Sequence, residues 1–477
     1  MRLLSIDVGT TSVKVGLVDD SGVLSVEERP IATATPTPGW VEQNTDDWWQ
    51  ATRQAIIRLA PRNVDGISVT GQMQDVIAMS NATPLRPAIL YSDQRAVDEH
   101  AYLSGRLDES WGKIALATPD HTNVAAKWMW LRGNEPSVVA DTTVVLLGAA
   151  GFVVHRLTGN ATCDRTTAAT TGLYDSLAGS WWTPVGEITD IPLPTLTDGV
   201  AGRLSAEAAS QLGLDSGLPV VHAPGDAVST SLGVLGTDVE IPYVYLGTTG
   251  WVGRFDAAAN PREGVIVLPA LDKWLTVAPM LNAGSAIDWV RELLGLDTAA
   301  FDRLAADGFA AESGVLFLPH LDGVRLPRPD PHASGTLVGL RRSTRPADIA
   351  VAAYEGVART LAGLLDHVSH AQPASLSVCG GGSRSDVWCQ TIADVSGLDV
   401  HRVSDEHASL RGASSAARLA LGTEPHPRPG TLARFHPRAA RSAAHLAARI
   451  RVERIESALF GATFSDPMEQ IVRNPSS

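Results

Sequence analysis

The chain has 477 residues, 44% of them hydrophobic and 19% charged, which is typical of a soluble globular protein of roughly two to four domains. The formal net charge of −14 argues against nucleic acid as a partner, and no apolar run approaches the ~18 residues of a membrane span. Three cysteines without a CxxC pair indicate neither a zinc cluster nor a disulfide framework, so we expect a reducing, cytoplasmic setting.

The first elements are three short strand patterns, LLSIDV, VKVGLV and GVLSVEE, joined by GTT and DDSG turns as an antiparallel meander. No basic and apolar leader precedes them, so no signal peptide is expected. Asn44 opens a helical stretch at about 45 to 60, with Asp46 and Asp47 in the first turn, where acids suit the helix dipole. The strand VDGISVT then ends in a polar loop, GQMQD, and helical and loop sequence fills most of 94 to 160.

A second unit repeats the opening arrangement. PVVHAPGD is a strand and turn followed by a helix pattern, and IPYVYLGTTGWVGRF is again strand, GTT turn and strand. The turn-rich GTDVEIP separates the units, so we predict domains at 1–238 and 239–430. The second contains a long helix at 346–370 and a strand, glycine loop, helix and strand around GGGS at 380–383.

The remaining residues, 431–477, are rich in alanine and arginine near their start. Val452, Ile455 and Leu459 share helical spacing, which predicts a docked terminal helix. The last dozen or so residues are expected to be frayed.

Each GTT turn is a candidate phosphate site, because free backbone N–H groups and threonine hydroxyls can cradle phosphate oxygens. One such turn alone favours a plain hairpin, but two matching turns favour phosphate binding. Asp7, just before the first turn, suits Mg²⁺, which takes one or two carboxylates plus substrate phosphates, or it forms an Asx motif. Asp226, in HAPGDAVSTS, is either a helix N-cap or a general base for a hydroxyl nucleophile.

Other motifs admit two interpretations each. The GGGS loop follows a strand but lacks the third glycine of GxGxxG, so it favours a backbone surface for adenine or ribose over a dinucleotide fold. Trp40 either stacks on a sugar or belongs to the core. Gln72, Met73, Gln74 and Asp75 form a polar loop without an obvious core role. Asp93 and Arg95 are either a self-contained ion pair or hydroxyl-binding groups.

These motifs together resemble the FGGY carbohydrate kinases, and within that family the xylulokinases, over residues 2 to about 422. The resemblance rests on ordered segments: IDVGTTSVK, PGWVEQNTDDWW, GQMQ, YSDQRA, PGDA, LGTTGWV, AGSAIDWV, FLPHLDGVRLPRPDP and GGGSRSDVWCQTIADVSGL. It implies an α/β fold of two actin-like (RNase H-like) domains around a central cleft. It also implies ATP- and Mg²⁺-dependent phosphorylation of a small-molecule sugar, D-xylulose first, with a homodimer left open.

The resemblance implies a role for each matching residue. Asp226 would be the catalytic base, and Asp7 would share the Mg²⁺ site with it. The residues implied to bind nucleotide are Thr10, Thr11, Gly247, Thr248, Gly284, Asp288, Gly381 and Gly382. Those implied to bind sugar are Gln72, Met73, Gln74, Asp93, Arg95 and Trp40.

The chain departs from the family's pattern at several points. GQMHG becomes GQMQD, which removes a sugar-facing histidine; GER becomes Gly-Val-Arg at 323–325, and ALGAA becomes Ser-Leu-Arg-Gly-Ala at 409–413. A commonly acidic residue is also lost from GAAGF. Other ketoses, polyols and sugar acids such as gluconate therefore remain alternatives, and glycerol is disfavoured because a TNQRE-like motif is absent. Three other protein classes stay open: a silent sugar or nucleotide sensor, an actin-type ATPase and, least favoured, a nicotinamide oxidoreductase.

Overall fold

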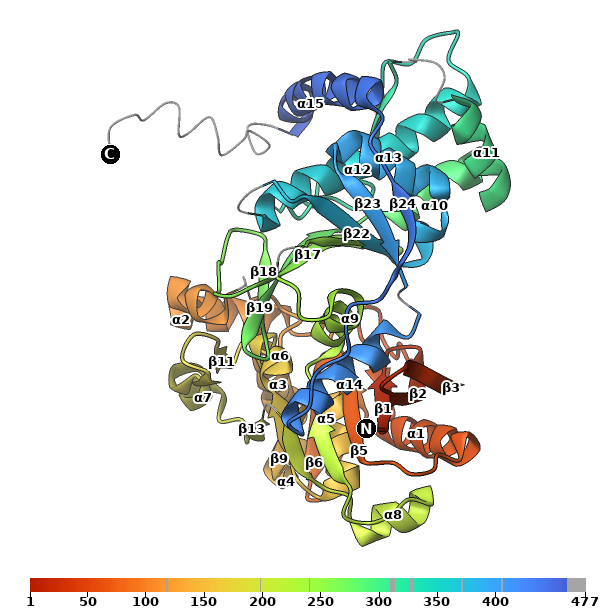
Figure 1. Ribbon diagram of the computed structural model, residues 1–477. Helices are drawn as coiled ribbons and strands as arrows, with labels where there is room; N and C mark the ends of the chain where they lie inside the picture. The colour runs from red at the N-terminus through yellow and green to blue at the C-terminus, as the bar shows by residue number, and fades with distance from the viewer. Residues whose placement is uncertain are drawn as a thin grey trace.

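The computed structural model forms two lobes, each built around a mixed sheet. In Figure 1 the second lobe lies above the first. The structure describes residues 1–116, 119–197, 199–239, 241–308, 314–326, 329–369, 372–404 and 406–460. In that part of the chain the first lobe has a six-stranded sheet and the second a seven-stranded sheet.

The sheet of the first lobe contains the predicted meander and three further strands. In spatial order its strands are β14 (Val200–Arg203), β15 (Pro219–His222), β5 (Gly66–Gly71), β1 (Leu3–Val8), β2 (Ser12–Asp19) and β3 (Gly22–Pro30). The antiparallel pairing of β1, β2 and β3 confirms the meander. β1, β5 and β15 run parallel to one another, so their carboxyl ends lie at the same edge of the sheet.

Side-chain alternation along β1 gives its two faces different neighbours. Leu4, Ile6 and Val8 lie in one apolar cluster with Trp48, while Leu3 lies in a separate cluster with Ala417. Successive residues of a strand point to opposite faces, so Asp7 points to the same face as Leu3. The carboxylate before the first GTT turn is therefore directed to the side of the sheet covered by residues near 417.

The helices of the first lobe are α1 (Thr45–Leu59), α2 (Val97–Ala115), α3 (Val124–Asn134), α4 (Pro136–Asp141), α5 (Ala149–Thr158), α6 (Arg165–Ala169), α7 (Thr183–Thr189), α8 (Ala206–Leu212) and α9 (Asp226–Leu235). The predicted start of α1 is confirmed: the Asn44 side chain accepts a hydrogen bond from the Asp46 N–H, and Asp46 and Asp47 occupy the first turn. The predicted strand, turn and helix around 219–235 are also confirmed, as β15 and α9.

The polar loop expected at GQMQD is wrong, because a strand starts inside it. β6 (Met73–Ser80) begins two residues after β5 ends and pairs with β9 (Val144–Gly148). The polar residues at the start of β6 obscure the apolar run VIAM, which drives this pairing. The pairing also places a strand, β9, in the stretch 94–160, where helix and loop were expected. The remaining short strands of this lobe are β4 (Glu42–Gln43), β7 (Thr83–Pro84), β8 (Ala88–Ile89), β10 (Thr162–Asp164), β11 (Tyr174–Asp175), β12 (Ser180–Trp181) and β13 (Thr195–Thr197).

The sheet of the second lobe confirms the repeated hairpin. Its strands in spatial order are β18 (Ile266–Ala270), β19 (Lys273–Met280), β17 (Gly250–Asp256), β16 (Tyr243–Leu246), β22 (Ser375–Cys379), β23 (Asp399–Val403) and β24 (Thr431–Phe435). β16 and β17 are antiparallel, whereas β16, β22 and β23 run parallel. Two shorter strands, β20 (Leu316–Leu318) and β21 (Thr336–Val338), pair separately.

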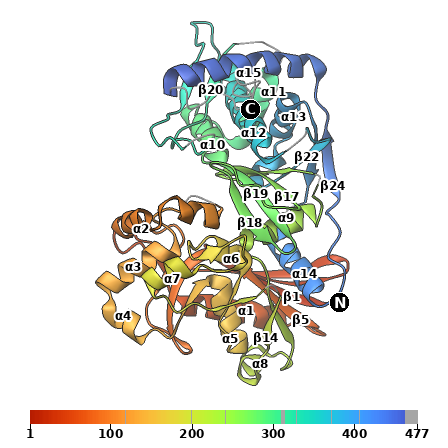
Figure 2. The same cartoon turned by 90° about the vertical axis from the view of Figure 1, so that its left-hand side faces the viewer.

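The helices of the second unit include the predicted long helix and terminal helix. They are α10 (Gly284–Leu293), α11 (Thr298–Gly308), α12 (Pro346–Val368), the short 3₁₀ helix η1 (Gly381–Arg384), α13 (Asp386–Ser396), α14 (Ala408–Ala420) and α15 (Ala439–Phe460). α15 lies along the outer side of the second lobe (Figure 2). Within α15, Val452 and Ile455 are half-buried, but Leu459 is 52% exposed and does not dock. The predicted fraying of the last dozen residues lies outside the described residues.

Helices α9 and α14 cross between the two sheets (Figure 1). α14 follows β23 of the second sheet, yet it packs against β1 and β5 of the first. The crossing requires glycine twice: a Cβ on Gly233 would lie 1.9 Å from the Ala408 carbonyl oxygen, and one on Gly412 would lie 1.7 Å from that of Ser229. No helix in the described residues is long and apolar enough to cross a membrane.

Candidate active site

The first sheet gathers three of the predicted motifs at one edge. The GTT turn follows β1, the segment 72–75 follows β5, and Asp226 follows β15 after a three-residue turn. Because these strands are parallel neighbours, all three motifs lie at the carboxyl edge of the sheet, where open α/β sheets bind ligands. We call residues 72–75 the acceptor loop, although its last three residues are also the first three of β6.

The tip of the first hairpin presents free donors. Among the described residues, the N–H groups of Thr10 and Thr11 donate no hydrogen bond, whereas the Gly9 N–H donates to the Ser12 carbonyl, 3.0 Å away. The Gln43 side chain holds the tip by donating to the Thr10 carbonyl over 2.7 Å. Two adjacent free N–H groups form a small anion-binding concavity.

Asp7 is almost completely buried, and one of its oxygens has a single partner. Ser409 of α14 donates its hydroxyl to Oδ2 over 2.5 Å, while Oδ1 is enclosed without a hydrogen-bond partner. Burial raises the pKa of Asp7 above its ordinary value, and the Ser409 hydroxyl partly offsets this. A buried carboxylate with an unsatisfied oxygen is costly in the absence of a cation or donor ligand.

Asp226 is the first residue of α9, and the N-cap position belongs to Gly225. The Ala227 N–H donates to Asp226 Oδ1 over 2.8 Å, and Oδ2 has no partner among the described residues. Burial, followed by the nearby charge of Asp7, raises the pKa of Asp226 to about 7. Asp226 thus stands close enough to Asp7 for their charges to interact, and its protonation state changes near neutral pH.

Asp164, which sequence reasoning missed, holds the turn before Asp226. Its Oδ1 accepts from the Gly225 N–H over 3.0 Å and from the Thr167 N–H over 2.9 Å, so one carboxylate caps α6 and fixes the start of α9. The local pattern, Asp three residues before the capped N–H, signals the cap. The contact with the Gly225 N–H spans 61 residues of sequence and has no local signal.

Replacing Asp226 with asparagine should stabilise the ligand-free protein most at alkaline pH. The folded state keeps a proton on Asp226 up to about pH 7, whereas the unfolded chain releases it near pH 4. The wild type therefore loses stability relative to Asp226→Asn as pH rises from 4 to 7, and the difference is constant above that range. Thermal unfolding in EDTA between pH 5 and 8 measures it; a difference independent of pH would contradict the assigned pKa.

In the acceptor loop, Gln72 and Met73 are held in different ways. Gln72 is buried and donates to Gln43 Oε1 over 3.0 Å, while its own Oε1 is enclosed without a partner. Met73 packs on Gly225, where an added Cβ would lie 2.2 Å from the Met73 sulfur. Met73 therefore lies directly beside the residue that precedes Asp226.

Gln74 and Asp75 complete the acceptor loop. Gln74 is half-buried and has a positive φ of 66°, a conformation uncommon for a residue other than glycine. Asp75 is fully buried; Oδ1 accepts from the Tyr91 N–H over 3.1 Å, and Oδ2 has no partner. Burial raises the pKa of Asp75 well above its ordinary value, despite the opposing charge of Lys127.

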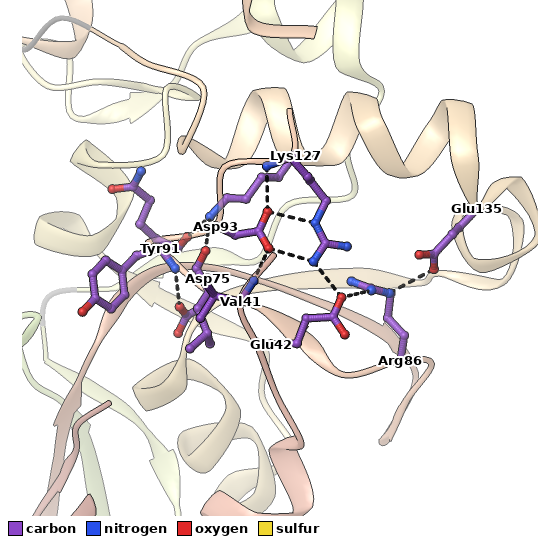
Figure 3. Close-up of polar contacts among 11 residues, drawn as sticks. Val41, Glu42, Asp75, Arg86, Tyr91, Asp93, Lys127 and Glu135 are labelled. Carbon is purple, nitrogen blue, oxygen red and sulfur yellow. Dashed lines mark hydrogen bonds and ion pairs between the residues drawn. The ribbon is translucent and has the colours of Figure 1, made fainter. Parts of the chain in front are cut away.

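Asp93 and Arg95 form a buried ion pair, and Asp93, Val41 and Glu42 of the surrounding network are labelled in Figure 3. Asp93 Oδ1 accepts from the Arg95 side chain and Oδ2 from both Arg95 and the Val41 N–H, so both oxygens are used. Arg95 also pairs with Glu42 over 2.7 Å. These contacts match the ion-pair interpretation of the two residues.

Trp40 is positioned by the same network. The Arg95 guanidinium lies 4.0 Å from the centre of the Trp40 ring, and Trp130 packs edge-on against Trp40 with 5.1 Å between ring centres. Trp40 is half-buried, so part of the ring remains accessible to a ligand.

The second sheet also gathers its motifs at one edge. β16 leads into Gly247 and Thr248, and its parallel neighbour β22 leads into Gly381 and Gly382. The Gly284 N–H, at the start of α10, donates to the Gly247 carbonyl over 2.8 Å, so the hairpin tip and the helix N-terminus touch. The Thr248 N–H donates no hydrogen bond among the described residues.

The glycines at this edge of the second sheet differ in how much space a side chain would have. A Cβ on Gly284 would lie 2.5 Å from the Gly247 carbonyl oxygen, and one on Gly382 would lie 2.3 Å from the Trp388 ring. At Gly381 a Cβ would meet nothing within 4 Å, so the backbone there faces open space. Asp288 is exposed on α10 and pairs with Arg291 over 3.1 Å.

Within the described residues, no three metal-binding side chains of His, Cys, Asp or Glu cluster together. The residues present nevertheless fit Mg²⁺, which keeps several waters and needs only one or two carboxylates when phosphates supply the rest. Asp7 offers an enclosed oxygen without a partner, and Asp226 is near enough for their charges to interact.

Comparison with known proteins gives matches along nearly the whole chain. Residues 2–233 match the N-terminal domain of the FGGY family of carbohydrate kinases, and residues 243–421 match its C-terminal domain. The xylulose kinase of Escherichia coli (strain K12) is 31% identical to this chain, and the match covers 88% of this chain and 90% of that protein. The xylulose kinase of Klebsiella pneumoniae is also 31% identical, and that match covers 90% of this chain and 92% of the relative. The crystal structure of the xylulose kinase from Rhodospirillum rubrum has a TM-score of 0.89 at 28% identity, covering 96% of this chain and 99% of that one.

Proposed function

The chain belongs to the FGGY family of carbohydrate kinases, and we propose that it transfers the terminal phosphoryl group of ATP to a hydroxyl of D-xylulose. The two-domain actin-like fold expected from the sequence is confirmed by the structural match. The observation that supports the proposed chemistry is the position of Asp226, beside the acceptor loop and near Asp7 at one sheet edge.

In this proposal Asp226 accepts the proton of the sugar hydroxyl. Phosphoryl transfer depends mainly on positioning and charge stabilisation, so a carboxylate suffices as the proton acceptor. Its Oδ2 is free to accept, while Oδ1 is fixed by the Ala227 N–H. Asp164 keeps the turn at Gly225 in place, and Met73 packs against the same turn from the acceptor loop.

We propose that Asp7 and Asp226 hold Mg²⁺ together with phosphate oxygens. The ion would neutralise charge on the phosphates during transfer. Thr10 and Thr11 would bind phosphate oxygens through their N–H groups, and so would Thr248 from the second lobe. Ser409 orients Asp7 by donating to its Oδ2, which leaves Oδ1 as the oxygen for the cation.

The nucleotide base would lie on the second lobe. Gly381 leaves its backbone open, and Gly382 and Gly284 permit close packing around it, which supports binding of a flat ring between the glycine loop and α10. Asp288 would contact the ribose from α10. The proposed domain division stays at 1–238 and 239–430, with the sugar held by the first domain and the nucleotide by the second.

The cellular setting and the assembly are also proposals. Cys163, Cys379 and Cys389 are all buried and form no disulfide within the described part of the chain, which supports a reducing, cytoplasmic compartment. A homodimer stays a prediction. Light scattering of the purified chain tests it by measuring the molar mass in solution.

Coupled ADP release across a panel of D-xylulose, D-ribulose, D-gluconate and glycerol tests the proposed function. We expect sugar-dependent turnover with the highest kcat/KM for D-xylulose and the lowest for glycerol. The same assay without sugar measures background hydrolysis. Nucleotide binding without sugar-dependent turnover would indicate a sensor, and equal ADP release with and without sugar would indicate an ATPase. A higher kcat/KM for D-gluconate or D-ribulose would replace D-xylulose as the substrate.

A further inference from the structure

The helix that begins with Asp226, α9, is also contacted from the second lobe. Ser231 lies on α9 one turn after Ala227, and its hydroxyl oxygen is 2.6 Å from that of Tyr243 on β16. The Trp251 indole N–H, on β17, donates to the same Tyr243 oxygen over 2.8 Å. A hydrogen-bond chain therefore joins the hairpin of the second lobe to the helix that carries the proposed base.

The direction of each hydrogen bond in this chain is fixed by chemistry. The Ser231 hydroxyl contacts the Ala227 carbonyl over 2.7 Å, and a carbonyl only accepts, so Ser231 donates there. The Trp251 indole only donates, so Tyr243 accepts from it. The Tyr243 proton is then left for Ser231, and burial, which raises the pKa of Tyr243, keeps that proton in place. The hydrogen bonds thus run from β17 through Tyr243 and Ser231 to the first turn of α9.

The aromatic residues of the same hairpin connect this chain to the proposed phosphate site. Tyr245 and Trp251 are opposite residues in the pairing of β16 with β17, and their rings stack with 4.0 Å between centres and 12° between planes. The Tyr245 ring also packs against Gly247, where a Cβ would lie 2.6 Å from it. Gly247 precedes Thr248, whose N–H is proposed to bind phosphate. The ring that supports the hairpin tip therefore stacks on the indole that starts the hydrogen-bond chain.

Tyr243 and Ser231 can act only on position, because neither can touch a substrate. Both residues are fully buried, with 0% of their surface exposed. The Tyr243 ring packs against Gly253, where a Cβ would lie 2.6 Å from it, and belongs to one apolar cluster with Val228 of α9. Asp164 holds the start of α9 from the first lobe, and Tyr243 is the corresponding contact from the second.

We propose that Tyr243 positions the base for phosphoryl transfer, because its hydrogen bond to Ser231 holds α9 in a fixed place relative to the hairpin tip at 247–249. The inference rests on the proposed function, which assigns the base to Asp226 and the phosphates to the hairpin tips. Transfer needs the hydroxyl, its base and the phosphate aligned, and a displacement of about 1 Å can lower the rate about 10²-fold. Loss of the Tyr243 hydroxyl should therefore slow transfer without weakening the binding of either substrate.

Tyr243→Phe tests this, because phenylalanine keeps the ring on Gly253 and loses only the hydroxyl. For the panel sugar with the highest kcat/KM, we expect kcat to fall about 10-fold, while KM for ATP and KM for the sugar stay within about twofold of wild type. Ser231→Ala removes the other partner of the same hydrogen bond and should have an effect of similar size. Thermal unfolding of each variant checks that it is folded at the assay temperature.

Ser396→Ala is the matched control for Ser231→Ala. Ser396 lies on α13, donates to the carbonyl four residues earlier and accepts one further hydrogen bond, but both of its partners are local. This control should keep the wild-type kcat. The double variant Tyr243→Phe/Ser231→Ala should have the kcat of either single variant, because all three proteins lack the same hydrogen bond.

Wild-type kcat in Tyr243→Phe, losses that multiply in the double variant, or an equal loss in Ser396→Ala would overturn the inference and leave the proposed function intact. A raised KM for ATP at unchanged kcat would also overturn it, because the hydrogen bond would then support binding rather than transfer. If Tyr243→Phe does not fold, Ser231→Ala decides by the same comparison. Absence of wild-type turnover with every sugar would remove the proposed function and this inference with it.

Discussion

Replacing Asp226 with alanine is expected to lower kcat by about 10²- to 10⁴-fold, the range typical of general-base catalysis, with little change in nucleotide affinity. The free Oδ2 of Asp226 is the proton acceptor of the proposed reaction, and alanine supplies none. In the proposed site, nucleotide would be bound mainly by backbone groups of the two hairpin tips and by the glycine loop, which the substitution leaves in place.

Asp226→Asn makes the same test with less disturbance, because its amide oxygen can still accept from the Ala227 N–H. Steady-state kinetics with saturating Mg²⁺–ATP give kcat, and titration calorimetry gives nucleotide affinity. Asp190→Asn is a suitable control: this aspartate is exposed, has a φ of 49°, and asparagine tolerates that conformation. Near-native turnover in both Asp226 variants would remove Asp226 from the role of base.

Replacing Gly412 with alanine should destabilise the protein by about 3 kcal/mol or more, at the upper end of overpacking effects. The new Cβ would lie 1.7 Å from the Ser229 carbonyl oxygen, a backbone atom that cannot move without separating α9 from α14. The consequence extends to the active site. Asp226 begins α9 one turn before Ser229, and Ser409, the partner of Asp7, lies on α14 one turn before Gly412.

Gly363→Ala is the matched control for this prediction. Gly363 lies inside α12, and a Cβ there would meet nothing within 4 Å. Alanine at this position should stabilise the protein by roughly 0.5–1 kcal/mol, because it lowers the entropy of the unfolded chain without a clash. Urea unfolding of both variants measures the difference. Equal stability of Gly412→Ala and Gly363→Ala would show that the helices do not cross at van der Waals contact.

The sequence predicted the elements whose signals are local. Both hairpins, the start of α1 at Asn44 and the glycine loop after β22 follow from alternation, capping residues and turn residues, and the structure confirms them. The duplicated GTT turn also identified two sheet edges that carry motifs, since parallel neighbours bring the following loops to one edge.

Features that depend on distant contacts were not predicted. The sequence predicts a polar loop at 72–75, because Gln74 and Asp75 mask a strand whose partner, β9, lies about 70 residues away. Nothing local signals that Lys127 donates to the Gln74 carbonyl or that Asp164 holds Gly225. Leu459 fits the helical spacing of a docked face but is exposed, whereas its neighbour Phe460 packs against Val324 and Ala333.

The position of α14 shows the same limit. By sequence it follows the second sheet, but Ser409, Gly412 and Ala417 contact the first lobe. Small residues along a helix permit close approach to a partner without identifying it. The contact between Ser409 and Asp7 spans 402 positions and required the folded structure.

Transfer of labelled phosphate from [γ-³²P]ATP to D-xylulose, followed in a single turnover by wild type and Asp226→Asn, tests the central claim most directly. We expect the label to appear on the sugar with the wild-type enzyme, and at a rate lower by orders of magnitude with the variant. Label released as inorganic phosphate at equal rates by both proteins, with none on the sugar, would contradict the account.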